Sequence, residues 1–120
     1  MATQDKVCSI APYFEAKPGK LAAVKEMCER FVAKTAKEPK ALYYGFSFDG
    51  DKMHCREAYA DASGVLAHLD NVGSILEELL KIADLTRLEI HGPAEEIKKL
   101  REPLAPFDPQ FFTLEYGFRK

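Results

Sequence analysis

Residues 54–69, HCREAYADASGVLAHL, decide the fold of this 120-residue chain. The first six residues alternate as in a β-strand, and from Val65 onward apolar residues recur at helical spacing. Asp61 lies between the two patterns, where a helix N-cap is expected, because its carboxylate can accept hydrogen bonds from the free N–H groups of a first helical turn. The stretch therefore predicts a strand that runs directly into an amphipathic helix.

The flanking sequence adds further elements. Residues 7–14 predict a first strand, and a helix follows from about Pro18 to Lys37. Alternating runs on either side of residues 48–51 predict a hairpin, because Asp49-Gly50 is a strong turn signal. Residues 84–92 predict a fourth strand, 94–101 a short helix and 111–116 a final strand. This β-α-β-β-α-β order predicts an α+β fold of the split β-α-β type: a four-stranded antiparallel sheet with both helices on one face, then a helical turn and an extra strand.

Strand alternation assigns side chains to the two sheet faces. In the strand before Asp61, one face carries Met53, Cys55, Glu57 and Tyr59, and the other carries His54 and Arg56. In residues 84–92, Leu85 is expected on the same face as Arg87, Glu89 and His91, opposite Leu88 and Ile90. Pro12 cannot donate to a ladder and predicts an edge or a bulge in the first strand. This alternation alone does not say which of the two sheet faces packs against the helices.

Composition limits the possible functions. Hydrophobic residues make up 47% and charged residues 30%, and the net charge is −2, which is typical of one globular domain spanning residues 1–120. The basic residues form no stripe, which argues against nucleic acid as a partner, and no apolar run is long enough to predict a membrane span. The N-terminus lacks a secretory signal, and the three cysteines have no C-x-x-C spacing, so we expect a cytoplasmic protein with reduced thiols.

The sheet face away from the helices predicts self-association. It carries aromatic and ionisable residues, and too few residues remain in the chain to cover it. The simplest closure is a homodimer with the two sheets face to face and the C-terminal arm crossing to the partner.

Three segments carry a resemblance to a known family: PYFEAKPGK at 12–20, Glu57-Ala58-Tyr59-Ala60-Asp61-Ala62, and Ala67-His68-Leu69. They resemble the antibiotic biosynthesis monooxygenase family of the dimeric α/β-barrel superfamily, over a core of residues 5–92, with 93–120 as an extension. The resemblance implies a ferredoxin-like fold, a small-molecule ligand and chemistry without a cofactor, with Glu57, Tyr59 and His68 at the pocket wall. The haem-degrading members rely on a Trp, which this chain lacks.

The catalytic candidates are His68, Glu57 and Tyr59. A neutral His68 could act as a general base, or it could be a structural histidine bonded to the backbone or to Glu57. Burial of Glu57 would raise its pKa toward neutrality, although an ion pair across a dimer interface would also explain this residue. Tyr59 could donate to a developing oxyanion or could simply be a core residue with a solvated hydroxyl.

The substrate-binding candidates are His54, Arg56, Tyr44 and Phe46. His54 and Arg56 would line the pocket if their face of the strand looks toward the helices. Metal-ligand spacing is absent from the sequence, so no metal site is predicted.

Three functions remain open. The chain could be a cofactor-independent monooxygenase for a small aromatic or enolisable compound, an isomerase or lyase of a small carbonyl compound, or a dimer that binds a small ligand without catalysis.

Overall fold

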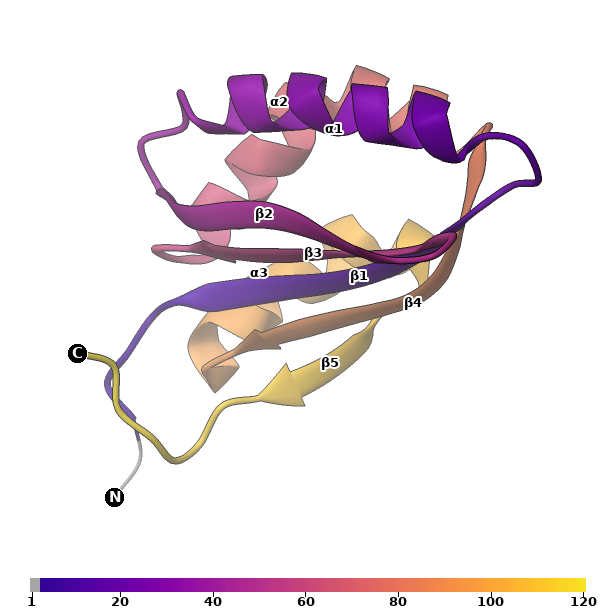
Figure 1. Ribbon diagram of the computed structural model, residues 1–120. Coiled ribbons are helices and arrows are strands. Elements are labelled where there is room, and N and C mark those ends of the chain that lie inside the picture. Colours follow the sequence, from indigo (N-terminus) through magenta and orange to yellow (C-terminus); the bar gives the residue numbers. More distant parts are fainter. Residues whose placement is uncertain (1–2) are drawn as a thin grey trace.

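The computed structural model describes residues 3–120; residues 1 and 2 of the predicted domain lie outside the described part. In chain order the elements are β1 (Cys8–Ala16), α1 (Leu21–Thr35), β2 (Ala41–Asp49), β3 (Lys52–Tyr59), α2 (Ala62–Leu79), β4 (Ala83–Gly92), α3 (Ala94–Leu104), the 3-10 turn η1 (Ala105–Phe107) and β5 (Gln110–Thr113). The sheet order is β2-β3-β1-β4-β5. All neighbouring strands are antiparallel except β4 and β5, which are parallel. The predicted α+β fold is confirmed, with an open sheet and α1 and α2 in one layer above it (Figure 1).

The hairpin forms at the predicted position. β2 and β3 pair from Asp49 with Lys52 to Ala41 with Tyr59. Gly50 adopts a φ of +59°, a left-handed conformation that glycine reaches without steric cost. The Asp-Gly signal therefore fixes the register that carries Glu57 and Tyr59.

Of the two alternatives for Pro12, the structure has the bulge. β1 is a central strand between β3 and β4, so Pro12 does not lie at an edge; it lies beside a bulge. Tyr13 pairs with Arg87 and Phe14 with Leu85, which leaves Thr86 as the inserted residue. Because one extra residue reverses strand alternation, Leu85 lies on the helix side of the sheet, and its predicted place beside Arg87 is wrong.

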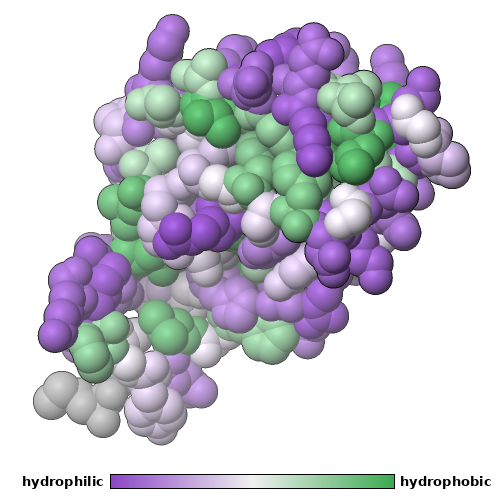
Figure 2. Space-filling model, in the orientation of Figure 1, coloured by the Kyte–Doolittle hydropathy of each residue, from purple (hydrophilic) through white to green (hydrophobic). Residues whose placement is uncertain are grey.

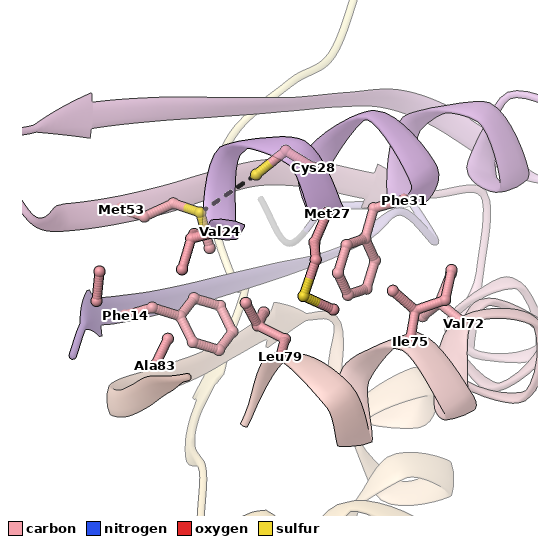
Figure 3. Packing of buried hydrophobic residues seen from close by; sticks show 11 residues of the cluster. Phe14, Val24, Met27, Cys28, Phe31, Met53, Val72, Ile75, Leu79 and Ala83 are labelled. Carbon is pink, nitrogen blue, oxygen red and sulfur yellow. Dashed lines mark hydrogen bonds between the residues drawn. The ribbon is translucent and has the colours of Figure 1, made fainter. Parts of the chain in front are cut away.

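The hydrophobic core fills the space between the helices and one face of the sheet. Phe14, Phe31 and Leu79 meet there from β1, α1 and α2, and the Sγ atom of Cys28 lies 3.5 Å from the Sδ atom of Met53 (Figure 3). A second cluster lies beside it, where α3 buries Ile97 and Leu100. The thiols of Cys8, Cys28 and Cys55 are all free and buried.

The C-terminal segment packs largely against its own chain. α3 contributes to the core, β5 extends the sheet, and the backbone N–H of Leu114 donates to the carbonyl oxygen of Gly92. The segment before β1 and the segment after β5 lie side by side (Figure 1). Arg119 pairs there with Asp5 at 3.0 Å. The arm that crosses to a partner stays a prediction for the residues after β5, where Tyr116 and Phe118 are 75% and 84% exposed.

No described helix packs on the other face of the sheet. Aromatic rings there stack in pairs, Tyr13 on His54 and His91 on Phe112. Figure 2 shows one side of the molecule, where hydrophobic residues gather in the middle with charged residues around them. Within residues 3–120, no helix is both long and apolar enough to cross a bilayer.

Two carboxylates cap the start of α2. As predicted, Asp61 is the N-cap, and its Oδ1 atom accepts a hydrogen bond from the N–H of Gly64 at 3.0 Å. The Oε1 atom of Glu96, from α3, accepts from the N–H of Ala62 at 3.0 Å. Hydrogen bonds from Lys40 and Ser63 lower the pKa of Asp61 to about 2.

We expect Asp61→Ala to lower the free energy of unfolding by about 1 kcal/mol at pH 7, because the helix loses its cap. A lowered pKa stabilises the folded state above the ordinary value of 3.8, and this contribution is lost as the pH falls toward 2. The difference between the variant and the wild type should therefore shrink between pH 4 and pH 2 in urea denaturation. Asp70→Ala, at an exposed position of the same helix, is the control, and an equal loss in that variant would contradict the capping role.

Candidate functional site

Glu57 is a carboxyl group inside the core. β3 directs it toward the helices, where it is 4% exposed. The hydroxyl of Tyr59, two residues along the same strand face, donates to its Oε1 atom at 2.6 Å. Burial raises the pKa of Glu57 to about 7, because the charged form loses its hydration, and the hydrogen bond from Tyr59 offsets only part of this effect. Glu57 can therefore take up or release a proton near neutral pH.

His68 lies between two carboxyl groups. It projects from α2, is 3% exposed, and its Nε2 atom is 3.4 Å from Oε1 of Glu57. Its Nδ1 atom is 2.9 Å from Oε2 of Glu38, in the segment after α1. Burial lowers the pKa of His68, although the Glu38 carboxylate opposes the shift. A neutral His68 that donates from Nδ1 to Glu38 leaves Nε2 as a proton acceptor facing Glu57.

Glu38 and Asn71 are parts of the site that the sequence analysis missed. The side-chain amide of Asn71 donates to Oε2 of Glu38 at 2.8 Å, so this oxygen holds both Asn71 and His68. The Oε1 atom of Glu38 is buried without a hydrogen-bond partner among residues 3–120, which is costly for a residue with only a structural role. The His-x-x-Asn spacing puts His68 and Asn71 on one helix face and could have indicated the pair, but no sequence pattern indicates Glu38.

Glu57 and His68 line a cavity of about 70 Å³ between the sheet and α2. Tyr44 and Phe46 line the same cavity from β2, and the rest of the wall is apolar apart from Cys55. The cavity runs across the sheet from β2 and β3, past Pro12 of β1, to Leu88 of β4 and Phe107 of η1. Glu57 and His68 therefore lie toward one end of this apolar cavity.

Two tyrosines flank the imidazole ring. The ring centroids of Tyr44 and Tyr59 lie 5.2 Å and 5.0 Å from that of His68. Burial raises the pKa of both phenols, so both keep their protons. Tyr44 lines the cavity and can donate to an oxygen atom of a ligand, whereas Tyr59 lies behind Glu57 and orients it.

The structure divides the predicted site residues between two sheet faces. Glu57, Tyr59 and His68 come together with Tyr44 and Phe46 on the helix side. His54 and Arg56 lie on the opposite face, away from this cavity, because they have the other strand parity. There His54 bonds through Nδ1 to the carbonyl oxygen of Pro12 at 2.9 Å, and the Arg56 guanidinium lies over the Tyr43 ring at 4.4 Å.

The alternative of an ion pair for Glu57 would need a basic partner such as Arg87 or Arg119, and both of these contact other carboxylates. Arg87 contacts Glu89 on the other face of the sheet, and Arg119 pairs with Asp5. Glu57 is therefore explained by its contacts with Tyr59 and His68. Residues 3–120 contain no group of three His, Cys, Asp or Glu side chains arranged to hold a metal ion.

Comparison with solved structures shows similarity to MupZ from Pseudomonas fluorescens, with 48% sequence identity over 100% of this chain and 94% of that chain and a TM-score of 0.95. Two further similar structures are assigned to the antibiotic biosynthesis monooxygenases. One, from Nitrosomonas europaea, has 16% identity over 78% of this chain and 96% of that chain and a TM-score of 0.69. The other, from Caulobacter crescentus, has 17% identity over 72% and 88% and a TM-score of 0.65. Comparison with protein-family models and with curated proteins gives no match.

The fold is that of the antibiotic biosynthesis monooxygenases, which confirms the predicted resemblance. The identity with MupZ extends over the whole chain, and this protein belongs to the same family as MupZ.

We expect Glu57→Gln to remove a pH dependence of stability. Glu57 holds its proton to about pH 7 in the folded state but ionises near 4.5 in the unfolded chain. Its contribution to the free energy of unfolding is therefore complete below pH 4.5 and is lost as the pH rises toward 7. The loss should be on the order of 3 kcal/mol in the wild type and absent from the variant, as measured by urea denaturation between pH 4.5 and 8. Glu77→Gln, at an exposed position of α2, is the control. If the free energy of unfolding changed with pH in the same way in the wild type and in Glu57→Gln, Glu57 would be charged in the folded state.

Proposed function

We propose that this protein is an acid–base enzyme of the cofactor-independent monooxygenase type, acting on a small compound with an enolisable or phenolic oxygen. The observation that carries the proposal is the juxtaposition of Glu57 and His68, two buried groups 3.4 Å apart, at an apolar cavity. A general base is most effective when its pKa lies near the working pH, and the pKa of Glu57 is about 7.

Each residue has a distinct part in the proposed reaction. Glu57 removes a proton from the substrate, and Nε2 of His68 receives or returns that proton. Glu38 is a positioning residue, because its hydrogen bond to Nδ1 fixes the tautomer of His68. Tyr44 donates to the oxygen that becomes an enolate or phenolate, where a donor in an apolar site is most effective.

Oxygen chemistry then needs no external reductant. An activated CH₂ group deprotonated in this way reacts with O₂; one oxygen atom becomes a carbonyl oxygen, and the other leaves as water with the two hydrogens of the CH₂ group. The substrate supplies all the electrons. A dry cavity protects the carbanion from reprotonation by solvent.

A redox-neutral reaction is the second candidate. Glu57 and His68 are adjacent, so one can remove a proton while the other returns it elsewhere on the same molecule, as isomerisation of a small carbonyl compound requires. This reaction would proceed without oxygen.

The proposed working form is a homodimer in the cytoplasm. The uncovered sheet face carries the stacked pairs Tyr13–His54 and His91–Phe112, and a second copy is its simplest cover. Three free, buried thiols suit a reducing compartment.

The test of activity is oxygen uptake and product formation with a panel of hydroquinones, β-diketones and simple ketones, with and without oxygen. We expect Glu57→Gln and His68→Asn to lower kcat/KM by 10²- to 10⁴-fold, the usual contribution of general acid–base catalysis. In the wild type, kcat/KM should rise with pH through about 7, as the Glu57 carboxylate forms. Turnover under strict anaerobiosis would select the redox-neutral reaction.

Tyr59→Phe is the matched variant for this pH profile. Loss of the hydroxyl removes a hydrogen bond that lowers the pKa of Glu57. The rise of kcat/KM with pH should therefore move to higher pH, while the cavity keeps its shape. Glu38→Gln should also alter the pH profile rather than KM alone. No turnover across the panel, or turnover that survives Glu57→Gln and His68→Asn, would leave ligand binding as the function.

The dimer has its own test. At micromolar concentration, light scattering should give twice the chain mass of 13.5 kDa. Tyr13→Glu, on the open face, should shift the equilibrium to monomers, because the new charge would be buried between the sheets, while Val32→Glu, exposed on α1, should not. A 13.5 kDa particle for the wild type would contradict the dimer.

A further inference from the structure

We infer that the substrate is chain-shaped: its oxygen-bearing end reaches Glu57 and His68, and an uncharged aliphatic tail leaves the cavity past Phe107 along a surface groove of α2. The groove, called here the α2 groove, has a volume of about 400 Å³ and lies between α2 and the α3–η1 turn. Its lining includes Leu66, Gly73, Leu76, Leu80, Pro103 and Phe107. This inference rests on the proposed function in one respect: that function places the oxygen-bearing end of the substrate at Glu57 and His68.

The groove and the cavity share a wall. Leu69, Leu76, Leu80 and Phe107 line both, so the groove and the cavity are neighbours separated by apolar side chains. Sheet order places Glu57 toward the β2–β3 side and Phe107 beyond β4. On the inferred route, a ligand that fills both spaces passes between these side chains beside Phe107 and ends at the acid–base pair.

The inner space is small for a ring. An apolar cavity of about 150 Å³ binds benzene, and the cavity beside Glu57 has less than half that volume, about 70 Å³. A polymethylene chain is thinner than a ring and fits where a polycyclic phenol does not. Of the two substrate types in the proposed function, the dimensions favour the enolisable chain over the aromatic compound.

The outer groove selects against negative charge. Its two ionisable residues, Asp70 and Glu77, are both acidic, and the lining contains no Lys or Arg. A carboxylate or phosphate on the tail would be repelled there. The tail therefore carries no negative charge, and the leucines of the lining favour a hydrocarbon chain.

Gly73 is the second independent observation. It lies within α2, where glycine costs roughly 1 kcal/mol relative to alanine. A Cβ atom built at this position meets no heavy atom within 4 Å, so packing does not require its absence. What glycine provides here is an open groove between the half-buried leucines of α2.

The experiment measures binding, and so separates this inference from the reaction. The probes are 2-alkanones from 2-pentanone to 2-undecanone, with 2-tetralone as a ring control, titrated calorimetrically into the full chain and into Glu57→Gln. Each added methylene should lower Kd about three- to fourfold, as burial of a CH₂ group predicts, until the tail passes the groove. Tetralone should bind more weakly than a linear ketone of equal carbon number. The ¹³Cδ resonance of Glu57 should shift on binding to the wild type.

The matched pair Gly73→Leu and Ser74→Leu tests the groove. Gly73→Leu should weaken binding of the longest ketones at least tenfold and leave the shortest unchanged, whereas Ser74→Leu, exposed on the same helix and outside the groove lining, should change neither. Circular dichroism checks that both variants are helical.

Three results would overturn the inference: affinity independent of chain length, tighter binding of tetralone, or equal effects of the two leucine variants. Tighter long-chain binding after removal of residues 114–120 would show instead that the chain terminus of this or a second copy occupies the groove. If chain-length dependence holds but no ketone is turned over, the proposed reaction fails and the chain-shaped site stands.

Discussion

The burial of one carboxyl group governs the rest of this site. Moving an ionised carboxylate out of water costs several kcal/mol, so Glu57 must either keep its proton or gain close partners. It does both: its pKa rises to about 7, and the hydroxyl of Tyr59 donates to it at 2.6 Å. The same apolar surroundings lower the pKa of His68. Burial thus raises the pKa of the carboxyl group and lowers that of the imidazole, which favours a proton on Glu57 beside a neutral His68 that can accept it.

The fold supplies this environment through its layers. β3 carries Glu57 and Tyr59 on one face. Only two residues separate this strand from α2, which returns over the sheet with His68 pointing at them. The N-cap at Asp61 and the second cap from Glu96 fix where the helix begins, and so fix how far along it His68 lies. The same helix carries the leucines and Gly73 of the α2 groove, so one element positions both the reactive pair and the proposed route to it.

Prediction from sequence worked best where local signals were strong. Asp49-Gly50 set the hairpin, Asp61 set the start of α2, and alternation grouped Glu57 with Tyr59. It failed at Leu85, because the inserted Thr86 reverses strand parity and leaves no mark in the residue pattern. His54 and Arg56 were candidates for a different reason. Strand alternation defines two faces of the sheet but does not say which of them the helices cover.

The sequence by itself determined the element order, the strand-to-helix junction and the shared strand face of Glu57 and Tyr59, since all of these depend on neighbours within a few residues. Tertiary structure alone decided which sheet face became the cavity wall, because that depends on where two distant helices pack. It also brought Glu38 to the imidazole from 30 residues away. No periodicity connects those positions; the contact exists because the end of α1 and the middle of α2 cross over the same part of the sheet.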